Sequence, residues 1–418
     1  MRLSLGSPCT LSPPSSSTQS CTLTHTHQPI RLNTKQPIAM PSWFPGITHT
    51  PVKLGNRWME YQGIRNWEGL LDPLDDNLRT EILRYGGFVE AAYNSFDFDT
   101  SSPTYAACRF PKSTLLERSS LPGTGYRVTK HLRATCGVKL PCWIEKTNSW
   151  VSTQSSWIGY VAVCQDKDEI ARLGRRDVVI AFRGTATCLE WLENLRATLA
   201  RLPEVDSDRT PKRQGPMVEG GFLSLYTSRT TMSPSLQEMV REEIKRILKT
   251  YGKEPLRLTM TGHSLGAALA ILSAYDIKAT FKCSPLVTVV SFGGPRVGNR
   301  NFRQLVEKQG INILRIVNSD DLITKVPGFV VDGDSEVANN EEYLHIAGLP
   351  KWIQKRVEET QLAYAEVGRE LKLSSKDCPY INSVNVATCH ELKTYLHLVN
   401  GFVSSSCPFR ATAKEGSQ

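Results

Sequence analysis

The amino-terminal part of the chain has almost no charge of one sign, because no aspartate or glutamate precedes Glu60. Basic residues are also sparse there, whereas 16 of the first 50 residues are serine or threonine. This part lacks the apolar stretch of about 7–15 residues that a secretory signal needs. A hydroxylated, acid-free and mildly basic leader is typical of an organelle transit peptide. We therefore expect residues 1–54 to be a transit peptide or a plain disordered leader. The high Ser and Thr content and the few arginines favour the chloroplast over the mitochondrion.

Long hydrophobic runs and basic clusters are also missing. No run of about 18 apolar residues occurs, so we expect no transmembrane segment and only peripheral contact with a membrane. The formal net charge is +9, and four basic residues of the leader account for part of it, which leaves +5 for the rest. No basic run with interleaved aromatic residues stands out, so we expect no nucleic-acid partner.

The 11 cysteines form no CxxC pair and no Cys/His cluster at zinc spacing. We therefore expect reduced thiols and no metal site, as in a stromal or cytosolic protein.

Strand and helix patterns alternate after residue 155. Five short apolar runs read as strands, and two stretches between them read as helices, 235–250 and 265–279. The expected strands are 157–164, 178–182, 256–261, 286–292 and 311–317. This alternation predicts a mostly parallel central sheet with helices on both faces.

The segments outside this pattern are less regular. Residues 66–98 read as mostly helical, and 100–155 as irregular. We expect 55–155 to be an amino-terminal extension that packs on a core domain of residues 156–418. A helix over 188–202 and the polar stretch 203–219 are interpreted either as a surface segment or as a mobile flap over the site.

The segment Gly262-His263-Ser264-Leu265-Gly266 carries the main chemical signal. It follows an expected strand and opens an expected helix, which is the context of a nucleophile elbow. Small residues must flank a nucleophile on such a sharp turn, and the helix start supplies N–H groups for an oxyanion. Ser264 is therefore the candidate nucleophile, and the N–H of Leu265 is a candidate oxyanion donor. His263 adjoins the serine, and we expect its side chain to diverge from that of Ser264.

The serine needs a base and an acid, which follow it in the order acid, then histidine, in α/β-hydrolases. Either Asp320 or Asp321 at the end of the expected strand 311–317 fits the acid. The histidines that follow are His345, His390 and His397.

A second oxyanion donor is expected in the strand-end sequence Phe182-Arg183-Gly184-Thr185, which lies upstream of the elbow as such loops do. Our candidate is the backbone N–H of Thr185, and the simpler interpretation is a turn at the end of a strand.

These motifs together resemble the class 3 lipases, the fungal-lipase-like branch of the α/β-hydrolase fold, over roughly residues 155–402. The marks are FRGT (182–185), GHSLGAALA (262–270), FGGPRVGN (292–299), an aspartate near Val-Pro and a carboxy-terminal histidine. The stretches WEGLLDPL (67–74), RYGGFVEAAYNSFDFD (84–99) and YLHLVNGF (395–402) are similar to plant class I chloroplast phospholipases A1, and the beta type is the nearest.

The resemblance assigns the acid and the base. The family's aspartate stands before a hydrophobic pair and a Thr-Lys-Val-Pro run, which implies Asp321. The family's histidine lies in the YLHLV motif, which implies His397, with His345 as the fallback and His390 as a surface residue. Asn400 stands where the family usually has aspartate, and we expect little effect from it.

The resemblance further implies a phospholipase A1 that attacks the sn-1 ester of phosphatidylcholine and plastid galactolipids, and possibly triacylglycerol, without a cofactor. Two alternatives are a soluble carboxylesterase or thioesterase and a non-catalytic lipase-like signalling protein.

Overall fold

The structure is a computed structural model, and it describes residues 53–135, 155–185, 199–202, 215–231, 233–325, 363–378 and 386–408. The chain divides into two compact units, residues 1–36 and 37–418, and all the described residues belong to the second.

The elements in chain order are η1 (Gly55–Arg57), α1 (Trp58–Tyr61), α2 (Asp76–Ser95), α3 (Leu115–Arg118), β1 (Tyr126–Ala134), β2 (Ser156–Cys164), α5 (Lys167–Leu173), β3 (Arg176–Phe182), β4 (Leu199–Arg201), β5 (Met217–Glu219), α7 (Gly220–Thr227), α8 (Leu236–Tyr251), β6 (Leu256–His263), α9 (Leu265–Thr280), β7 (Leu286–Phe292), α10 (Arg300–Lys308), β8 (Asn312–Asn318), η3 (Ile323–Lys325), β9 (Arg369–Leu373), α12 (Val386–His390) and α13 (Leu392–Gly401).

Seven of the strands form one sheet in the order β1-β2-β3-β6-β7-β8-β9. The first two strand pairs are antiparallel, and the four pairs from β3 to β9 are parallel. Strands β4 and β5 pair separately with each other. The predicted α/β fold with a mostly parallel sheet is confirmed.

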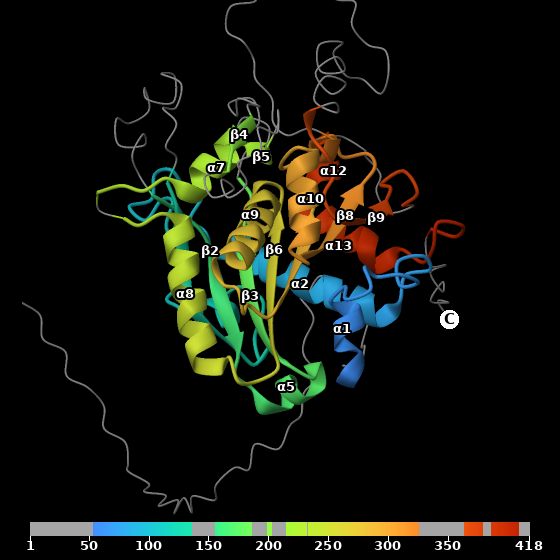
Figure 1. Cartoon of the computed structure of the whole chain (residues 1–418), viewed down its shortest axis with the longest axis horizontal. Helices are drawn as coiled ribbons and strands as arrows, with labels where there is room; N and C mark the ends of the chain where they lie inside the picture. Colours follow the sequence, from blue (N-terminus) through green and yellow to red (C-terminus); the bar gives the residue numbers. More distant parts are fainter. Residues whose placement is uncertain are drawn as a thin grey trace, which may run out of the picture. The chain divides into compact units, whose positions relative to one another are not determined.

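Helices cover both faces of the sheet, and each face has its own hydrophobic core. Figure 1 shows α9 crossing in front of β6, whereas α2 passes behind the strands. Alternate residues of one strand enter different cores: Val178, Ile180 and Phe182 pack on the side of α8 and α9. Val179 and Ala181 pack on the side of α2 and α13. This alternation follows from the two-residue repeat of a strand and explains why β3 is apolar from Val178 to Phe182.

The amino-terminal extension is more closely integrated than our sequence analysis expects. Strand β1, which the sequence analysis reads as irregular, forms the edge of the main sheet by pairing with β2. Helix α2 supplies much of the second core. The expected boundary between residues 155 and 156 therefore lies between two neighbouring strands of one sheet.

Helix α2 begins with an aspartate cap and is held firmly to α13. The side chain of Asp75 accepts hydrogen bonds from the N–H groups of Asn77 and Leu78. The buried Arg79 donates to the carbonyl oxygen of Val399 at 2.5 Å, near the end of α13. Because the last carbonyls of a helix have no partner within it, this contact ties the two helices together.

The predicted strands correspond to β2, β3, β6, β7 and β8, and the two predicted helices to α8 and α9. Strand β9 pairs with β8 and was not predicted. The proposed flap lies mostly outside the described residues, but its segment 199–201 is a strand rather than the end of a helix. None of the helices in the described ranges is long and apolar enough to span a bilayer.

Candidate active site

Ser264 occupies a sharp turn between β6 and α9. Its backbone has φ 57° and ψ −126°, which a side chain other than glycine rarely adopts. Its N–H donates to the carbonyl oxygen of Phe292 at 3.0 Å, which fixes the turn against the neighbouring strand β7. Such local strain is commonly found at functional sites. Leu265 is the first residue of α9, so its N–H belongs to the helix-start group that has no partner within the helix.

The two glycines of the motif are needed for close packing. A side chain on Gly262 would collide with the backbone of Gly266. A Cβ atom on Gly266 would lie 2.6 Å from the carbonyl oxygens of Phe182 and Arg183. The turn therefore packs directly against the end of β3, where the predicted oxyanion loop begins.

Asp321 is the acid that the structure places in the site. It lies just after β8 and is fully buried. Its Oδ1 accepts from the N–H of Ile323 at 2.9 Å, and its Oδ2 accepts from the hydroxyl of Tyr395 at 2.6 Å. Asp320 instead bonds to Ser374 and Lys376. The strand pattern leaves the choice between Asp320 and Asp321 open, and the geometry favours Asp321.

The histidine paired with this acid is His390 and not the predicted His397. Nδ1 of His390 lies 2.6 Å from Oδ2 of Asp321. His390 is also buried, at 6% exposure, so the expectation of a surface residue is wrong. A carboxylate accepts hydrogen bonds, so Nδ1 carries the proton, and Nε2 is the ring nitrogen left to act as a base.

The geometry of α13 explains why His397 does not pair with this acid. Tyr395 is the residue of this helix that points its hydroxyl at Asp321. His397 follows two positions later, about 200° around the helix axis at 3.6 residues per turn. It is half-buried, and this burial lowers the pKa of its imidazole. The fallback candidate, His345, lies outside the described residues.

The motif that suggested His397 therefore lies in a helix that contacts Asp321, but His397 is not the residue that makes the contact. Its tyrosine contacts the acid, and its histidine faces elsewhere. His390 ends the five-residue helix α12, just before Glu391, which occupies the N-cap position of α13. A helix this short leaves almost no periodic signal in the sequence, so the position of His390 had to come from the structure.

The loop after β3 has the features of an oxyanion loop. Arg183 donates to the carbonyl oxygen of Gly184 at 2.7 Å and to that of Trp157 at 2.9 Å. Because the Gly184–Thr185 peptide is trans, the N–H of Thr185 points away from the Gly184 carbonyl that Arg183 holds. A Cβ atom on Gly184 would lie 3.0 Å from Cβ of Ser264, so this loop contacts the nucleophile.

Arg183 is itself held rigidly. It is buried, and its guanidinium lies 3.5 Å from the centre of the Phe96 ring. Burial lowers the pKa of the guanidinium to about 10, so the group still carries a charge at neutral pH. A charged donor strengthens its hydrogen bond to the Gly184 carbonyl and fixes the peptide of Thr185.

His263 contacts the site through both of its ring nitrogens. Its Nε2 lies 2.6 Å from the carbonyl oxygen of His390, and its Nδ1 lies 2.8 Å from the hydroxyl of Tyr93. Tyr93 comes from helix α2. Sequence reasoning missed both Tyr93 and Tyr395, although each stands in a stretch that carried the resemblance.

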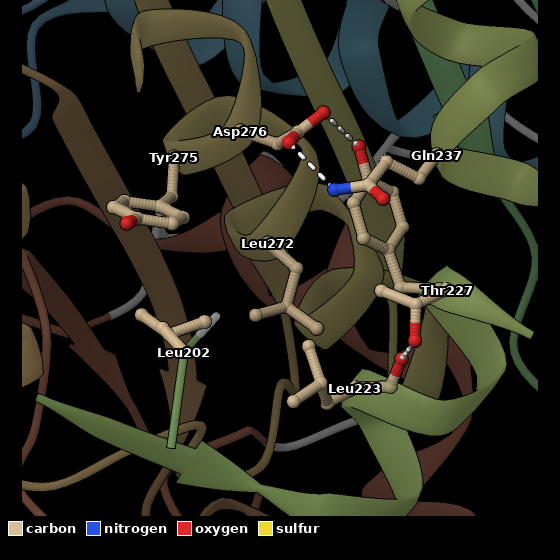
Figure 2. Close-up of a pocket in the computed structure, with 8 residues that line it drawn as sticks. Leu202, Leu223, Thr227, Gln237, Leu272, Tyr275 and Asp276 are labelled. Carbon is tan, nitrogen blue, oxygen red and sulfur yellow. Dashed lines mark hydrogen bonds between the residues drawn. The ribbon is translucent and has the colours of Figure 1, made fainter. Parts of the chain in front are cut away.

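A separate small cavity of about 120 Å³ lies between α7, α8 and α9 (Figure 2). Leu202, Leu223 and Leu272 form its apolar side, and Asp276 accepts from the amide of Gln237 at 2.8 Å. Asp276 stands 12 positions after Ser264 along α9, or about 18 Å at 1.5 Å per residue. It therefore plays no part in the site around Ser264. The described ranges contain no cluster of three or more His, Cys, Asp or Glu side chains arranged to hold a metal.

Residues 179–331 match the family described as lipase (class 3). The chain is 68% identical over 372 residues to the chloroplastic phospholipase A(1) DAD1 of Arabidopsis thaliana, which covers 88% of this chain and 82% of that one. It is 38% identical over 372 residues to the chloroplastic galactolipase DONGLE of the same plant, with coverages of 85% and 72%.

Among solved structures, the lipase from Rhizopus microsporus var. chinensis aligns over 78% of this chain and 84% of its own, with 18% identity and a TM-score of 0.42. The predicted chloroplast localisation is confirmed by the plant relatives, which are named chloroplastic. The chain therefore belongs to the plant class I chloroplastic phospholipase A1 family of class 3 lipases and is a carboxylic ester hydrolase.

Proposed function

We propose that this enzyme releases the sn-1 fatty acid from phosphatidylcholine and from plastid galactolipids, with triacylglycerol as a further substrate. The names of its relatives, phospholipase A(1) and galactolipase, support this substrate class. The observation that carries the mechanism is the 2.6 Å contact between Asp321 and His390, in the site that also contains the strained Ser264.

The reaction is a two-step acyl transfer. Nε2 of His390 takes the proton of Ser264 while Oγ attacks the ester carbonyl. Asp321 remains a carboxylate, holds the imidazole in the required tautomer and stabilises its charged form. The tetrahedral intermediate then loses the lysolipid alcohol, which receives the proton from His390. Water, deprotonated by the same histidine, then attacks the acyl-serine, and His390 returns the proton to Oγ of Ser264 as the fatty acid is released.

The backbone N–H groups of Leu265 and Thr185 stabilise the negative oxygen of both intermediates. Removing one such donor typically costs about 3 kcal/mol of transition-state stabilisation. The packing of Gly266 against the end of β3 supports this assignment, because it puts the start of α9 next to the loop that carries the Gly184–Thr185 peptide.

The enzyme meets its substrate at a membrane surface. Outside the leader the chain carries a modest positive excess, which favours anionic lipid surfaces slightly.

The experiment gives the full-length protein phosphatidylcholine and a galactolipid, each with different acyl chains at sn-1 and sn-2, and identifies the fatty acid released. We expect the sn-1 chain from the parent and none from Ser264→Ala. Release of the sn-2 chain would contradict the regiochemistry. Activity that does not rise above the critical micelle concentration would favour a soluble esterase, and no release from any lipid would favour a non-catalytic protein.

A further inference from the structure

Helix α2 extends from the far end of the sheet to the site, and its Tyr93 contacts two parts of it. The Tyr93 hydroxyl accepts from the N–H of Gly184 at 2.9 Å. The same oxygen lies 2.8 Å from Nδ1 of His263. One hydroxyl from the amino-terminal extension thus joins the oxyanion loop to the residue that precedes the nucleophile.

The direction of each hydrogen bond in this chain is fixed by chemistry. A carbonyl oxygen only accepts, so Nε2 of His263 donates to the carbonyl of His390 over 2.6 Å. Burial lowers the pKa of His263 well below its usual range, with the nearby His390 as a second cause, so the ring is neutral. A neutral imidazole has one N–H, and Nδ1 of His263 therefore accepts from the hydroxyl of Tyr93.

This chain of hydrogen bonds ends at the backbone of the catalytic histidine, His390. His390 is the last residue of α12, where carbonyl groups have no partner within the helix. Asn318, at the end of β8, donates to the preceding carbonyl, that of Cys389, at 2.9 Å. Two successive carbonyls are thus anchored to the ends of β6 and β8, and this fixes the direction in which the His390 side chain leaves the backbone.

We infer that Tyr93 and His263 are positioning residues that hold the Gly184–Thr185 loop and the base His390 at a fixed separation across Ser264. The inference rests on the proposed function, because it takes His390 as the base and Thr185 as an oxyanion donor. It also gives the amino-terminal extension a part in positioning the site, since α2 supplies one of the two side chains.

The expected effect concerns the rate rather than binding. Neither side chain is assigned a contact with the substrate, so their loss leaves KM nearly unchanged. A misplacement of about 1 Å can lower a rate by roughly 100-fold, and we expect kcat to fall by roughly 10- to 100-fold. Because both residues act through one chain of hydrogen bonds, their losses will not multiply in the double variant.

The test compares Tyr93→Phe with Tyr85→Phe in the full-length protein. Tyr85 lies on the same helix and is buried, but its hydroxyl bonds to Gln62 and Arg175 at the opposite end of the sheet. Both substitutions remove one hydrogen-bonded hydroxyl, so both will lower the unfolding temperature. Only Tyr93→Phe should lower kcat.

Substitutions of His263 provide a second readout. The amide nitrogen of a glutamine reaches roughly the place of Nε2, so His263→Gln keeps a donor for the His390 carbonyl, and His263→Ala keeps none. We expect kcat to fall in the order parent, His263→Gln, His263→Ala, with the double variant Tyr93→Phe/His263→Ala no worse than about twofold below His263→Ala.

The outcomes separate this inference from the proposed function. Activity that survives Ser264→Ala refutes the proposed function, whatever Tyr93 does. An inactive Ser264→Ala together with a Tyr93→Phe variant of parental kcat, or with a Tyr85→Phe variant that loses as much kcat as Tyr93→Phe, refutes the positioning role alone.

Discussion

Nδ1 of His390 lies 2.6 Å from Oδ2 of Asp321, and both side chains are buried. The resemblance to class 3 lipases suggests His397 as the base, whereas this contact indicates His390. This contact also makes the two histidines a matched pair for an experiment, since they stand seven positions apart in neighbouring helices.

The first prediction concerns these two histidines. His390→Gln should lower kcat by on the order of 10⁴-fold or more, because it removes the base that activates the nucleophile. His397→Gln should change kcat by less than about threefold, because its side chain lies on another side of α13. Initial rates of fatty-acid release from phosphatidylcholine, with both variants shown to be folded, decide between them. An inactive His397→Gln variant together with an active His390→Gln variant would support His397 as the base.

The second prediction concerns the hydroxyl of Tyr395. It donates to the same Asp321 oxygen that accepts from His390, so it keeps the carboxylate oriented. A hydrogen bond to a charged group contributes about 1.5 kcal/mol or more, so Tyr395→Phe should lower kcat by roughly tenfold.

The matched control is Tyr160→Phe, which removes another buried hydroxyl, one that donates to the carbonyl of Phe88 at 2.8 Å. Steady-state kinetics of both variants, taken where both are folded, should show a rate loss for Tyr395→Phe alone. Equal losses would mean that the effect of Tyr395 is on stability only.

Sequence reasoning predicted the parts of this protein that rest on periodic patterns and on local chemistry. The apolar strands β3, β6 and β7 and the elbow at Ser264 carry strong signals, because each is decided within a few residues. Strand β1 was missed because it lies at the edge of the sheet and alternates irregularly. Its pairing with β2 depends on residues about 30 positions away, which no local pattern encodes.

The site illustrates the same limit. The motif YLHLV lies in α13, but the choice between Tyr395 and His397 depends on which face of that helix meets Asp321. That face is set by long-range packing, including the contact of Arg79 with the carbonyl of Val399. Likewise, nothing near Tyr93 in the sequence indicates that its hydroxyl reaches Gly184, because the two are 91 positions apart.

The third prediction concerns Arg183. Its guanidinium holds the carbonyls of Gly184 and Trp157 at once, which a lysine ammonium with its single nitrogen does less well. Arg183→Lys should therefore loosen the oxyanion loop and lower kcat by roughly 10- to 100-fold with little change in KM. Arg176→Lys, at the other end of the same strand, is the control, since Arg176 bonds to Cys164 and Glu254 far from the loop. A similar kcat for both variants would argue against a role of Arg183 in holding Thr185.

The fourth prediction concerns stability and Glu219, which caps α7. Its Oε2 accepts from the N–H of Phe222 at 2.7 Å, but its Oε1 is buried and has no hydrogen-bond partner in the described part of the chain. Burial raises the pKa of this carboxyl to about 7. The folded protein thus binds a proton more tightly than the unfolded chain, whose glutamates titrate near about 4.5. The free energy of unfolding should therefore decrease as the pH rises from about 4.5 to about 7, by at most about 3 kcal/mol from this group.

Glu219→Gln removes this titration while leaving an amide oxygen to accept from Phe222. Its free energy of unfolding relative to the parent should therefore rise between pH 5 and pH 8, as measured by urea denaturation at several pH values. Glu238→Gln is the control, because Glu238 belongs to the capping box of α8 and hydrogen bonds from Ser235 lower its pKa. That group is already ionised in both states above pH 5, so its variant should show a constant difference from the parent. If the difference in free energy of unfolding between Glu219→Gln and the parent is also constant with pH, Glu219 is ionised in the folded protein throughout this range. In that case Oε1 has a partner that stabilises its charge.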